Sequence, residues 1–226
     1  MIVLQTDHFV NKIVTDCFAL GSKAKLIKIS DLKERSEETL VSYGILRGTG
    51  EVFKKAKNFY YIDHGYLSAS KRAFVDGSTV VKNLDGYFRV VKNDFIEIKK
   101  GKFDSKRLNE LDIKFKPKRK SGEFIILSEP SEHIKEFFKI NNWIEKTYKE
   151  LKNFTDRKIL IHNKQSKISL DELLQNAWAF VSFQSAAGFK AMIQGIPAHF
   201  TYDSLKNIKP IKNIESGIID YQIFNN

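Results

Sequence analysis

Residues 180–200 read FVSFQSAAGFKAMIQGIPAHF, and this stretch decides the fold. An apolar strand over 179–183 runs into the small-residue turn 184–188, and a helix over 189–194 is ended by Gly195-Ile196-Pro197 before a short strand. A strand that delivers small residues to a helix start exposes backbone N–H groups and the positive end of the helix dipole, which attract phosphate or carboxylate. The other interpretation is an ordinary βαβ turn whose small residues only let the helix pack closely, because the GxGxxG and GxxxxGK[ST] signatures are missing.

Two alternating series of strand and helix patterns surround this stretch. The first series predicts strands over 2–5, 25–30, 39–46 and 59–67, with helices over 8–22 and 47–58. The second predicts strands over 124–130 and 158–164, with helices over 131–142, 143–154 and 169–177. Such alternation is typical of parallel sheets covered by helices.

We therefore predict an α/β fold with two Rossmann-like domains facing across a cleft. The first domain spans residues 1–120 and includes an irregular basic insertion over 68–120, in which GYFRVVKN (86–93) contributes a strand. The second domain spans residues 121–226.

Composition limits the class of protein. A hydrophobic content of 42% over 226 residues is enough for a core, and no apolar run is long enough to span a membrane. The N-terminus lacks a signal-peptide pattern, and the single Cys17 excludes an internal disulfide. A cytoplasmic location is the resulting expectation, and composition does not predict an oligomeric state.

The chain is strongly basic. A net charge of +11 favours polyanions or anionic small molecules as partners, DNA among them. Much of the excess lies in residues 99–120, KKGKFDSKRLNELDIKFKPKRK. This segment is either a basic hinge facing a cleft or a solvated linker.

Asp63 and His64 stand together at the end of the apolar strand YYIDHG (60–65). A carboxylate or an imidazole at a strand end can be held into a cleft as a general base. The structural alternative is that Asp63 caps a turn and His64 packs. The five histidines are scattered without metal-binding spacing, so no metal is expected.

A second group of candidates surrounds the strand KILIH (158–162). Arg157, His162 and Lys164 combine two cations and an imidazole near the 184–188 turn, and such groups suit a diphosphate. Solvent exposure is the alternative interpretation. The candidate anion-binding residues on the turn and its helix are Gln184, Ser185, Ala186 and Lys190.

The carboxyl ends of parallel strands also place Arg47 and Tyr66 at a candidate acceptor or phosphate site. Arg89, between Phe88 and Val90 on an apolar strand, is the third such residue. Its guanidinium would either clamp a phosphate or pair with a carboxylate such as Asp63.

The ordered segments resemble a family of uncharacterised phage and bacterial proteins related to GT-B glycosyltransferases and to capsular-polysaccharide-type transferases. The segments that carry the resemblance are YGILRGTG (43–50), YYIDHGYL (60–67), GYFRVVKN (86–93), TDRKILIHNK (155–164) and the opening stretch. Two features depart from the family. The helix after the turn lacks the acid that often binds the donor ribose, with Glu215 the nearest later carboxylate, and a final helix returning to the first domain is not evident.

The resemblance implies a glycosyltransferase whose C-terminal domain holds a nucleotide-sugar donor, with a UDP-sugar expected. Asp63 or His64 would be the base, and the turn at Ser185 would stabilise the leaving diphosphate. The acceptor would be a hydroxymethylated base in phage DNA or a surface glycan. The alternative from another class is a non-catalytic nucleic-acid-binding protein on a transferase-like fold.

Overall fold

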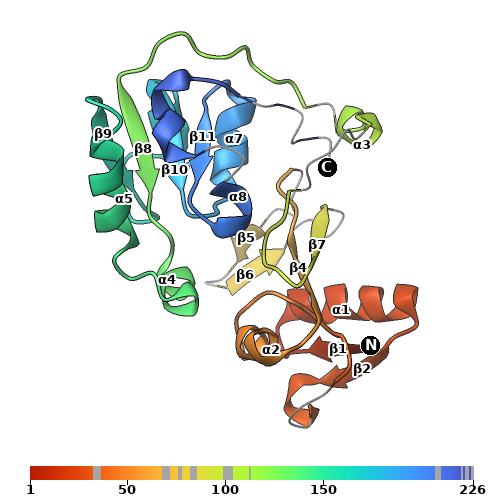
Figure 1. Ribbon diagram of the computed structural model, residues 1–226. Helices are drawn as coiled ribbons and strands as arrows, with labels where there is room; N and C mark the ends of the chain where they lie inside the picture. The colour runs from red at the N-terminus through yellow and green to blue at the C-terminus, as the bar shows by residue number, and fades with distance from the viewer. Residues whose placement is uncertain are drawn as a thin grey trace. The chain divides into compact units, whose positions relative to one another are not determined.

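A computed structural model describes residues 1–32, 37–67, 72–75, 78–81, 86–98, 104–111, 113–206, 210–219, 221 and 224. The chain divides into two units, Met1–Phe95 and Ile96–Asn226, and each contains helices and a mainly parallel sheet (Figure 1). The sequence pattern alone predicts this boundary after residue 120. The contacts place it after Phe95, because the extended segment 113–120 hydrogen-bonds to the C-terminal unit.

The N-terminal sheet has the strand order β2-β1-β3-β4-β7. Its first four strands pair in parallel, as the alternating sequence predicted, whereas β7 runs antiparallel to β4. The strands are β1 (Ile2–Gln5), β2 (Lys25–Lys28), β3 (Leu40–Tyr43), β4 (Phe59–His64) and β7 (Phe88–Lys92). The helices are α1 (Phe9–Ser22), α2 (Thr49–Lys55) and the 3-10 turn η1 (Ile29–Asp31).

Alternate residues of these strands enter two cores. Val3, Val41 and Ile62 pack with Val10 and Val14 of α1 on one face. On the other face α2 inserts Phe53 into a cluster formed by Ile2, Leu4, Leu40, Phe59 and Tyr61. Side chains that alternate along a strand point to opposite faces, which is why both faces are apolar.

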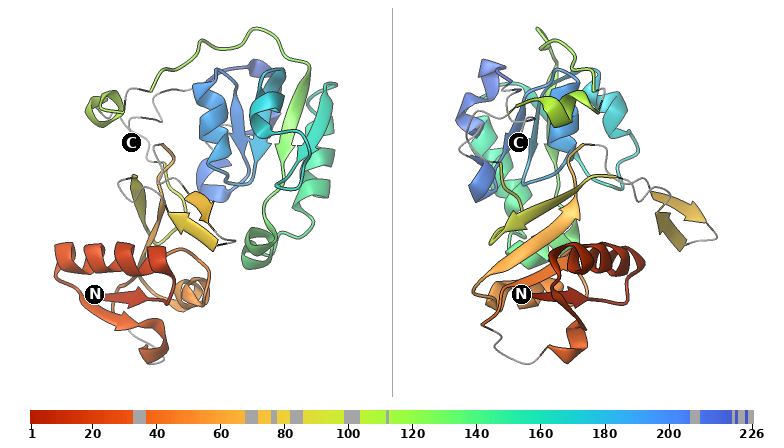
Figure 2. Two further views of the ribbon diagram at one scale, coloured as in Figure 1. Left: turned by 180° about the vertical axis from the view of Figure 1, so that it is seen from behind. Right: turned by 90° about the vertical axis from the view of Figure 1, so that its right-hand side faces the viewer.

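A long connection between β4 and β7 is closed at its base. The Gly65 N–H donates to the Tyr87 carbonyl at 2.6 Å, and a Cβ at Gly65 would lie 2.8 Å from that oxygen. We call this pair the neck of the 66–86 insertion. Within the insertion, β5 (Arg72–Val75) and β6 (Ser78–Val81) form an antiparallel hairpin (Figure 2).

The C-terminal sheet is parallel throughout, with the order β11-β10-β8-β9. Its strands are β8 (Phe124–Ser128), β9 (Lys158–His162), β10 (Ala177–Ser182) and β11 (Ala198–Phe200). The helices of this unit are α3 (Lys106–Asn109), α4 (Glu132–Phe138), α5 (Trp143–Lys152), α6 (Leu170–Leu174), α7 (Ala187–Ile193), α8 (Asp203–Lys206) and the 3-10 segment η2 (Ile211–Ser216).

Helices cover both faces of the C-terminal sheet (Figures 1 and 2). On one face, Trp143 and Leu151 of α5 share a core with Ile211 and Ile214 of η2 and the alternate strand residues 125, 127, 179 and 181. On the other face, Phe189 of α7 packs against Phe200. In the described part of the chain, no helix is both long and apolar enough to cross a membrane.

Candidate functional site

The order of strands in the C-terminal sheet creates a switch point. The chain leaves β8 for β9 on one side, then crosses back to β10 on the other side of β8. Connections that leave two adjacent parallel strands in opposite directions open a crevice at the carboxyl ends of those strands. The crevice therefore lies where β8 and β10 end.

Polar side chains meet at this carboxyl edge. Ser128 is in register with both His162 and Ser182, so three neighbouring strands end on polar residues side by side. His162 is half-buried, and Lys164 lies exposed just beyond the strand. The structure thus brings His162 and Lys164 to the edge from which residues 184–186 emerge.

The 184–186 loop satisfies part of its own hydrogen-bonding capacity. The Ser185 N–H donates to Ser182 Oγ at 3.3 Å, and the Ala187 N–H donates to Ser185 Oγ at 3.2 Å. Ala186 is the cap residue that precedes α7. The Gln184 Oε1 atom is buried and has no hydrogen-bond partner among the described residues. The loop therefore presents one unused buried acceptor.

Lys190 forms an ion pair with Asp171 at 2.5 Å, and both side chains are largely exposed. Lys190, which the sequence predicts to bind an anion, thus already has the Asp171 carboxylate as its partner.

An acid–base network that the sequence analysis missed occupies the β8 side of the crevice. The Glu129 carboxylate accepts hydrogen bonds from Lys135 Nζ at 2.9 Å and from Asn163 Nδ2 at 3.1 Å. These bonds, the one from Lys135 first, lower the pKa of Glu129. Lys135 also pairs with Glu132 at 2.7 Å, and the hydrogen bonds that it donates to Glu132 and Glu129 raise its pKa. The network ties α4 to the ends of β8 and β9.

A cavity of about 620 Å³ opens at the same edge, on the face covered by α5. Trp143 and Phe183 form part of its lining, and the Trp143 indole N–H donates to Thr201 Oγ1 at 2.7 Å. Lys139 and Lys146 lie exposed on its rim, and neither forms an ion pair with any described residue. Its lining therefore combines two mostly buried aromatic rings with two ammonium groups and the carboxylates of Glu150 and Asp203, and the ammonium groups suit a phosphate.

Arg157 does not join this group. It precedes β9, five residues before His162, which is about 16 Å along an extended strand. Its guanidinium donates to the Glu215 carboxylate at 3.1 Å and to the Gly122 carbonyl at 2.6 Å, and it lies 4.2 Å from the Trp178 ring centroid. These contacts fix the amino edge of the sheet, opposite the crevice.

The N-terminal unit carries a separate polar cluster where β4 meets β7. Asp63 and Arg89 are in register, and their side chains pair at 2.9 Å. The Tyr61 hydroxyl donates to Asp63 at 2.7 Å, and the His64 N–H donates to the same carboxylate at 2.8 Å. Burial, followed by the Asp63 charge, raises the pKa of Tyr61, which keeps the phenol protonated as a donor. Arg89 thus pairs with the carboxylate, one of its two predicted roles.

The His64 ring lies beside this cluster with its own partners. Its Nε2 atom is 2.8 Å from the Tyr43 hydroxyl, and its ring stacks on Phe88 with the centroids 5.4 Å apart. The Arg89 guanidinium carbon lies over the Tyr66 ring, 4.9 Å from the ring centroid. His64 therefore has a fixed orientation within an aromatic frame.

Arg47 belongs to the loop that follows β3. It is exposed and has a left-handed backbone with φ of 60°, in a loop bounded by Gly44 and Gly48. An arginine is strained in this conformation. Its guanidinium forms no ion pair with another described residue.

No protein-family model matches the chain, and a search of the curated proteins found no similar one. Within the described residues, no group of three or more His, Cys, Asp or Glu side chains is placed to hold a metal ion.

Proposed function

We propose that this protein is a glycosyltransferase that moves a sugar from a nucleotide-sugar donor, a UDP-sugar in the first instance, to an acceptor hydroxyl. The observation that carries the proposal is the cavity with Trp143, Lys139 and Lys146 at the carboxyl edge of a parallel sheet. Sheets of this kind bind nucleotides at that edge, beside the switch point. The GT-B-like pairing of two Rossmann-like units is part of the proposal.

The donor chemistry can be assigned to groups at this edge. The nucleobase would lie against Trp143 and Phe183, and the rim lysines would approach the phosphates. Ser185, Gln184 and His162 would contact the diphosphate and the sugar. As the bond between the anomeric carbon and the phosphate oxygen breaks, the diphosphate takes the electron pair, and nearby cations stabilise its charge.

The acceptor step needs a base in the N-terminal unit, and Asp63 and His64 are the two proposed groups. The Asp63 carboxylate accepts bonds from Tyr61, Arg89 and the backbone, and the His64 Nε2 atom lies 2.8 Å from the Tyr43 hydroxyl. One of the two would take the acceptor proton as the oxygen attacks the anomeric carbon. Arg47 and Tyr66 remain the proposed acceptor contacts, with a hydroxymethylated DNA base and a surface glycan as the acceptors to compare.

Calorimetry with UDP-, GDP- and CMP-sugars tests donor binding directly. Lys146→Ala should weaken binding of the preferred donor about tenfold, because one charge-assisted contact is lost. Lys149→Ala is the matched control: Lys149 is on the same helix, is also exposed and lies outside the cavity lining. Equal binding by both variants would contradict the placement of the donor.

A second pair of variants uses the two ends of β9. Lys164→Ala at the carboxyl edge should lower turnover, whereas Lys158→Ala at the amino edge should leave it unchanged. Mass spectrometry of mixed nucleotide sugars incubated with hydroxymethylated DNA or glycan acceptors gives the readout. Absence of binding or transfer with every donor would reject the transferase proposal.

A further inference from the structure

A basic segment of the C-terminal unit is held in place along its length. Residues 113–120, IKFKPKRK, precede β8 and form an extended stretch without regular pairing; we call them the basic strap. The sequence left open whether these lysines belong to a solvated linker. The contacts of the backbone and of the non-lysine side chains decide this question.

The backbone of the strap is anchored at Lys116 and Arg119. The Lys116 N–H donates to the Ile193 carbonyl at 2.8 Å, and the Arg119 N–H donates to the Gly195 carbonyl at 2.9 Å. The Arg119 guanidinium also donates to the Ala177 carbonyl at 3.2 Å and to the Gln175 carbonyl. The strap is therefore joined to the segments that precede β10 and β11.

Aromatic packing fixes the first half of the strap. The Phe115 ring lies 5.3 Å from the Tyr221 ring and 4.9 Å from the Phe224 ring, measured between centroids. The Tyr221 hydroxyl donates to the Lys116 carbonyl at 3.1 Å. The aromatic side chain of the strap is thus used for packing, and it is not available to stack on a ligand.

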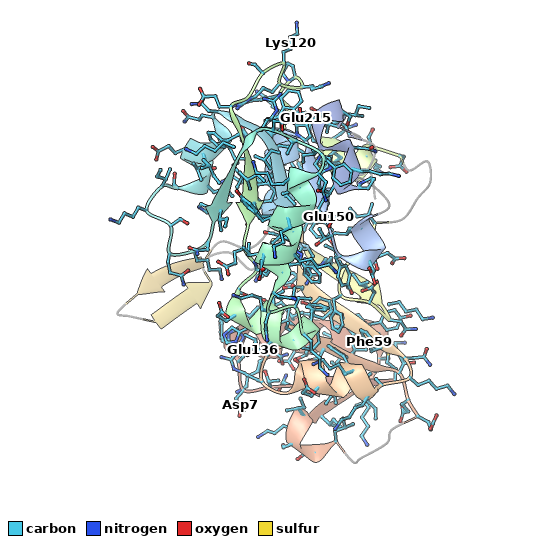
Figure 3. The ribbon with its side chains drawn as sticks, turned by 60° about the vertical axis from the view of Figure 1, so that its left-hand side comes forward. Asp7, Phe59, Lys120, Glu136, Glu150 and Glu215 are labelled. Atoms are coloured by element: carbon cyan, nitrogen blue, oxygen red, sulfur yellow. The ribbon has the colours of Figure 1, made fainter. Side chains whose placement is uncertain are left out.

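The lysines of the strap face solvent. Lys114, Lys116, Lys118 and Lys120 are all exposed, and none forms an ion pair with another described residue. Between residues 113 and 122 the sequence contains no acid. Figure 3 shows Lys120 and Glu215 at one end of the C-terminal unit and Glu136 of α4 at the other. The strap is therefore far from the carboxyl edge that carries the cavity.

We infer that the basic strap binds the phosphodiester backbone of nucleic acid. Anchoring means that the four ammonium groups are held near one another before a ligand arrives, so less entropy is lost on binding than for a free linker. Phosphate contacts of this kind supply sequence-independent affinity, and Phe115 is not free to read or stack bases. Binding should therefore be insensitive to sequence and steeply dependent on salt. This inference does not depend on the proposed transferase activity.

Fluorescence anisotropy of a labelled 30-base-pair DNA duplex, titrated with the full chain at several salt concentrations, tests the inference. We expect a dissociation constant of about 1–100 µM at physiological salt. A quadruple variant removes the strap charges by Lys114→Gln, Lys116→Gln, Lys118→Gln and Lys120→Gln. It should reduce the slope of log affinity against log salt by roughly 3 to 4, at about 0.9 per phosphate contact. Affinity at low salt should fall at least about tenfold.

The matched control removes the same charge from the N-terminal unit. It replaces four exposed lysines outside the strap and outside every proposed site, by Lys25→Gln, Lys28→Gln, Lys55→Gln and Lys57→Gln. This variant should keep most of the slope. Replacing the four strap lysines with Arg should preserve binding, which separates loss of charge from loss of folding.

Several results would overturn the inference. Equal losses in the strap and control variants would show that net charge alone attracts DNA. Binding to phosphatidylserine vesicles without binding to DNA would assign the strap to a membrane surface. No detectable DNA binding by the unmodified protein would also reject it, whether or not calorimetry finds nucleotide-sugar binding.

Discussion

Asp63 and Arg89 face each other across β4 and β7, with 2.9 Å between the carboxylate Oδ2 and the guanidinium Nη2. The pair exists only because β7 runs antiparallel to β4, so that the start of one strand meets the end of the other. The Arg89 side chain retains 19% of its exposure and that of Asp63 28%. A partly buried pair with additional hydrogen bonds from Tyr61 orders this corner of the sheet, beside His64.

Breaking this pair should destabilise the N-terminal unit. Arg89→Met leaves the Asp63 carboxylate without its cation, and we expect the free energy of unfolding to fall by about 1–3 kcal/mol. Adding Asp63→Asn should restore part of the loss, because the unpaired charge is then removed. Urea denaturation of both single variants and the double variant measures the coupling. Additive effects would show that the pair contributes no interaction energy.

Arg157 should be essential for stability and dispensable for donor binding. Arg157→Ala removes its bonds to Glu215 and Gly122 and exposes the Trp178 face, so we expect a loss of about 2 kcal/mol. Thermal denaturation measures this loss, and calorimetry at a temperature where the variant is folded measures donor affinity. His162→Ala provides the opposite case, with weaker donor binding expected. A donor affinity reduced in Arg157→Ala as much as in His162→Ala would return Arg157 to the binding site.

Gly195 ends α7 at a place where only glycine fits. Its φ is +79°, and an added Cβ would overlap the Pro117 carbonyl oxygen of the basic strap. Gly195→Ala should therefore destabilise the C-terminal unit by roughly 2 kcal/mol or more. Gly21→Ala is the matched substitution, since nothing lies within 4 Å of a Cβ there and the residue is helical. It should stabilise the protein by about 0.5–1 kcal/mol, and chemical denaturation would compare the two.

The Glu129 network should make stability depend on acidity. The pKa of Glu129 is lower in the folded protein than in the unfolded chain. The Glu129 carboxylate therefore contributes its full stabilisation at pH values above its ordinary pKa of 4.5. That contribution is lost as pH falls through the folded-state pKa. Glu129→Gln should cost about 1 kcal/mol at neutral pH and show a smaller further loss on acidification. Parallel losses in both proteins between neutral pH and pH 3 would show that another group is responsible.

The parallel parts of the fold could be read from the sequence because apolar strands alternate with helix patterns. The direction of β7 could not: GYFRVVKN has the same alternation in either orientation, and the β4–β7 connection does not carry a helix pattern that would fix it. The N-terminal boundary of the C-terminal unit could not be predicted from the sequence either. Tertiary hydrogen bonds from Lys116 and Arg119 and the packing of Phe115 on Tyr221 and Phe224 show that the strap belongs to it.

The candidate site was predictable to the extent that strand ends determine it. His162, Lys164 and the 184–186 loop do share one edge, because β9 and β10 both run parallel to β8, which lies between them. A strand advances about 3.3 Å per residue, which places Arg157 at the opposite end of β9 from His162. This separation could have been predicted from the sequence. Glu129 and Asn163 each follow an apolar strand and could have been found in this way. The cavity could not, because it depends on how the turn between α4 and α5 packs against β11 and η2.

The neck at Gly65 and Tyr87 makes the part of the insertion beyond Tyr66 a replaceable module. Because the two ends of the insertion are already joined, a change in its length leaves the β4–β7 register untouched. Doubling such a loop costs only about 0.6 kcal/mol in closure entropy. Divergence among descendants of this chain can therefore concentrate in the insertion, while Asp63, His64 and Arg89 keep their places on the sheet. An engineer could graft new loops at the same point.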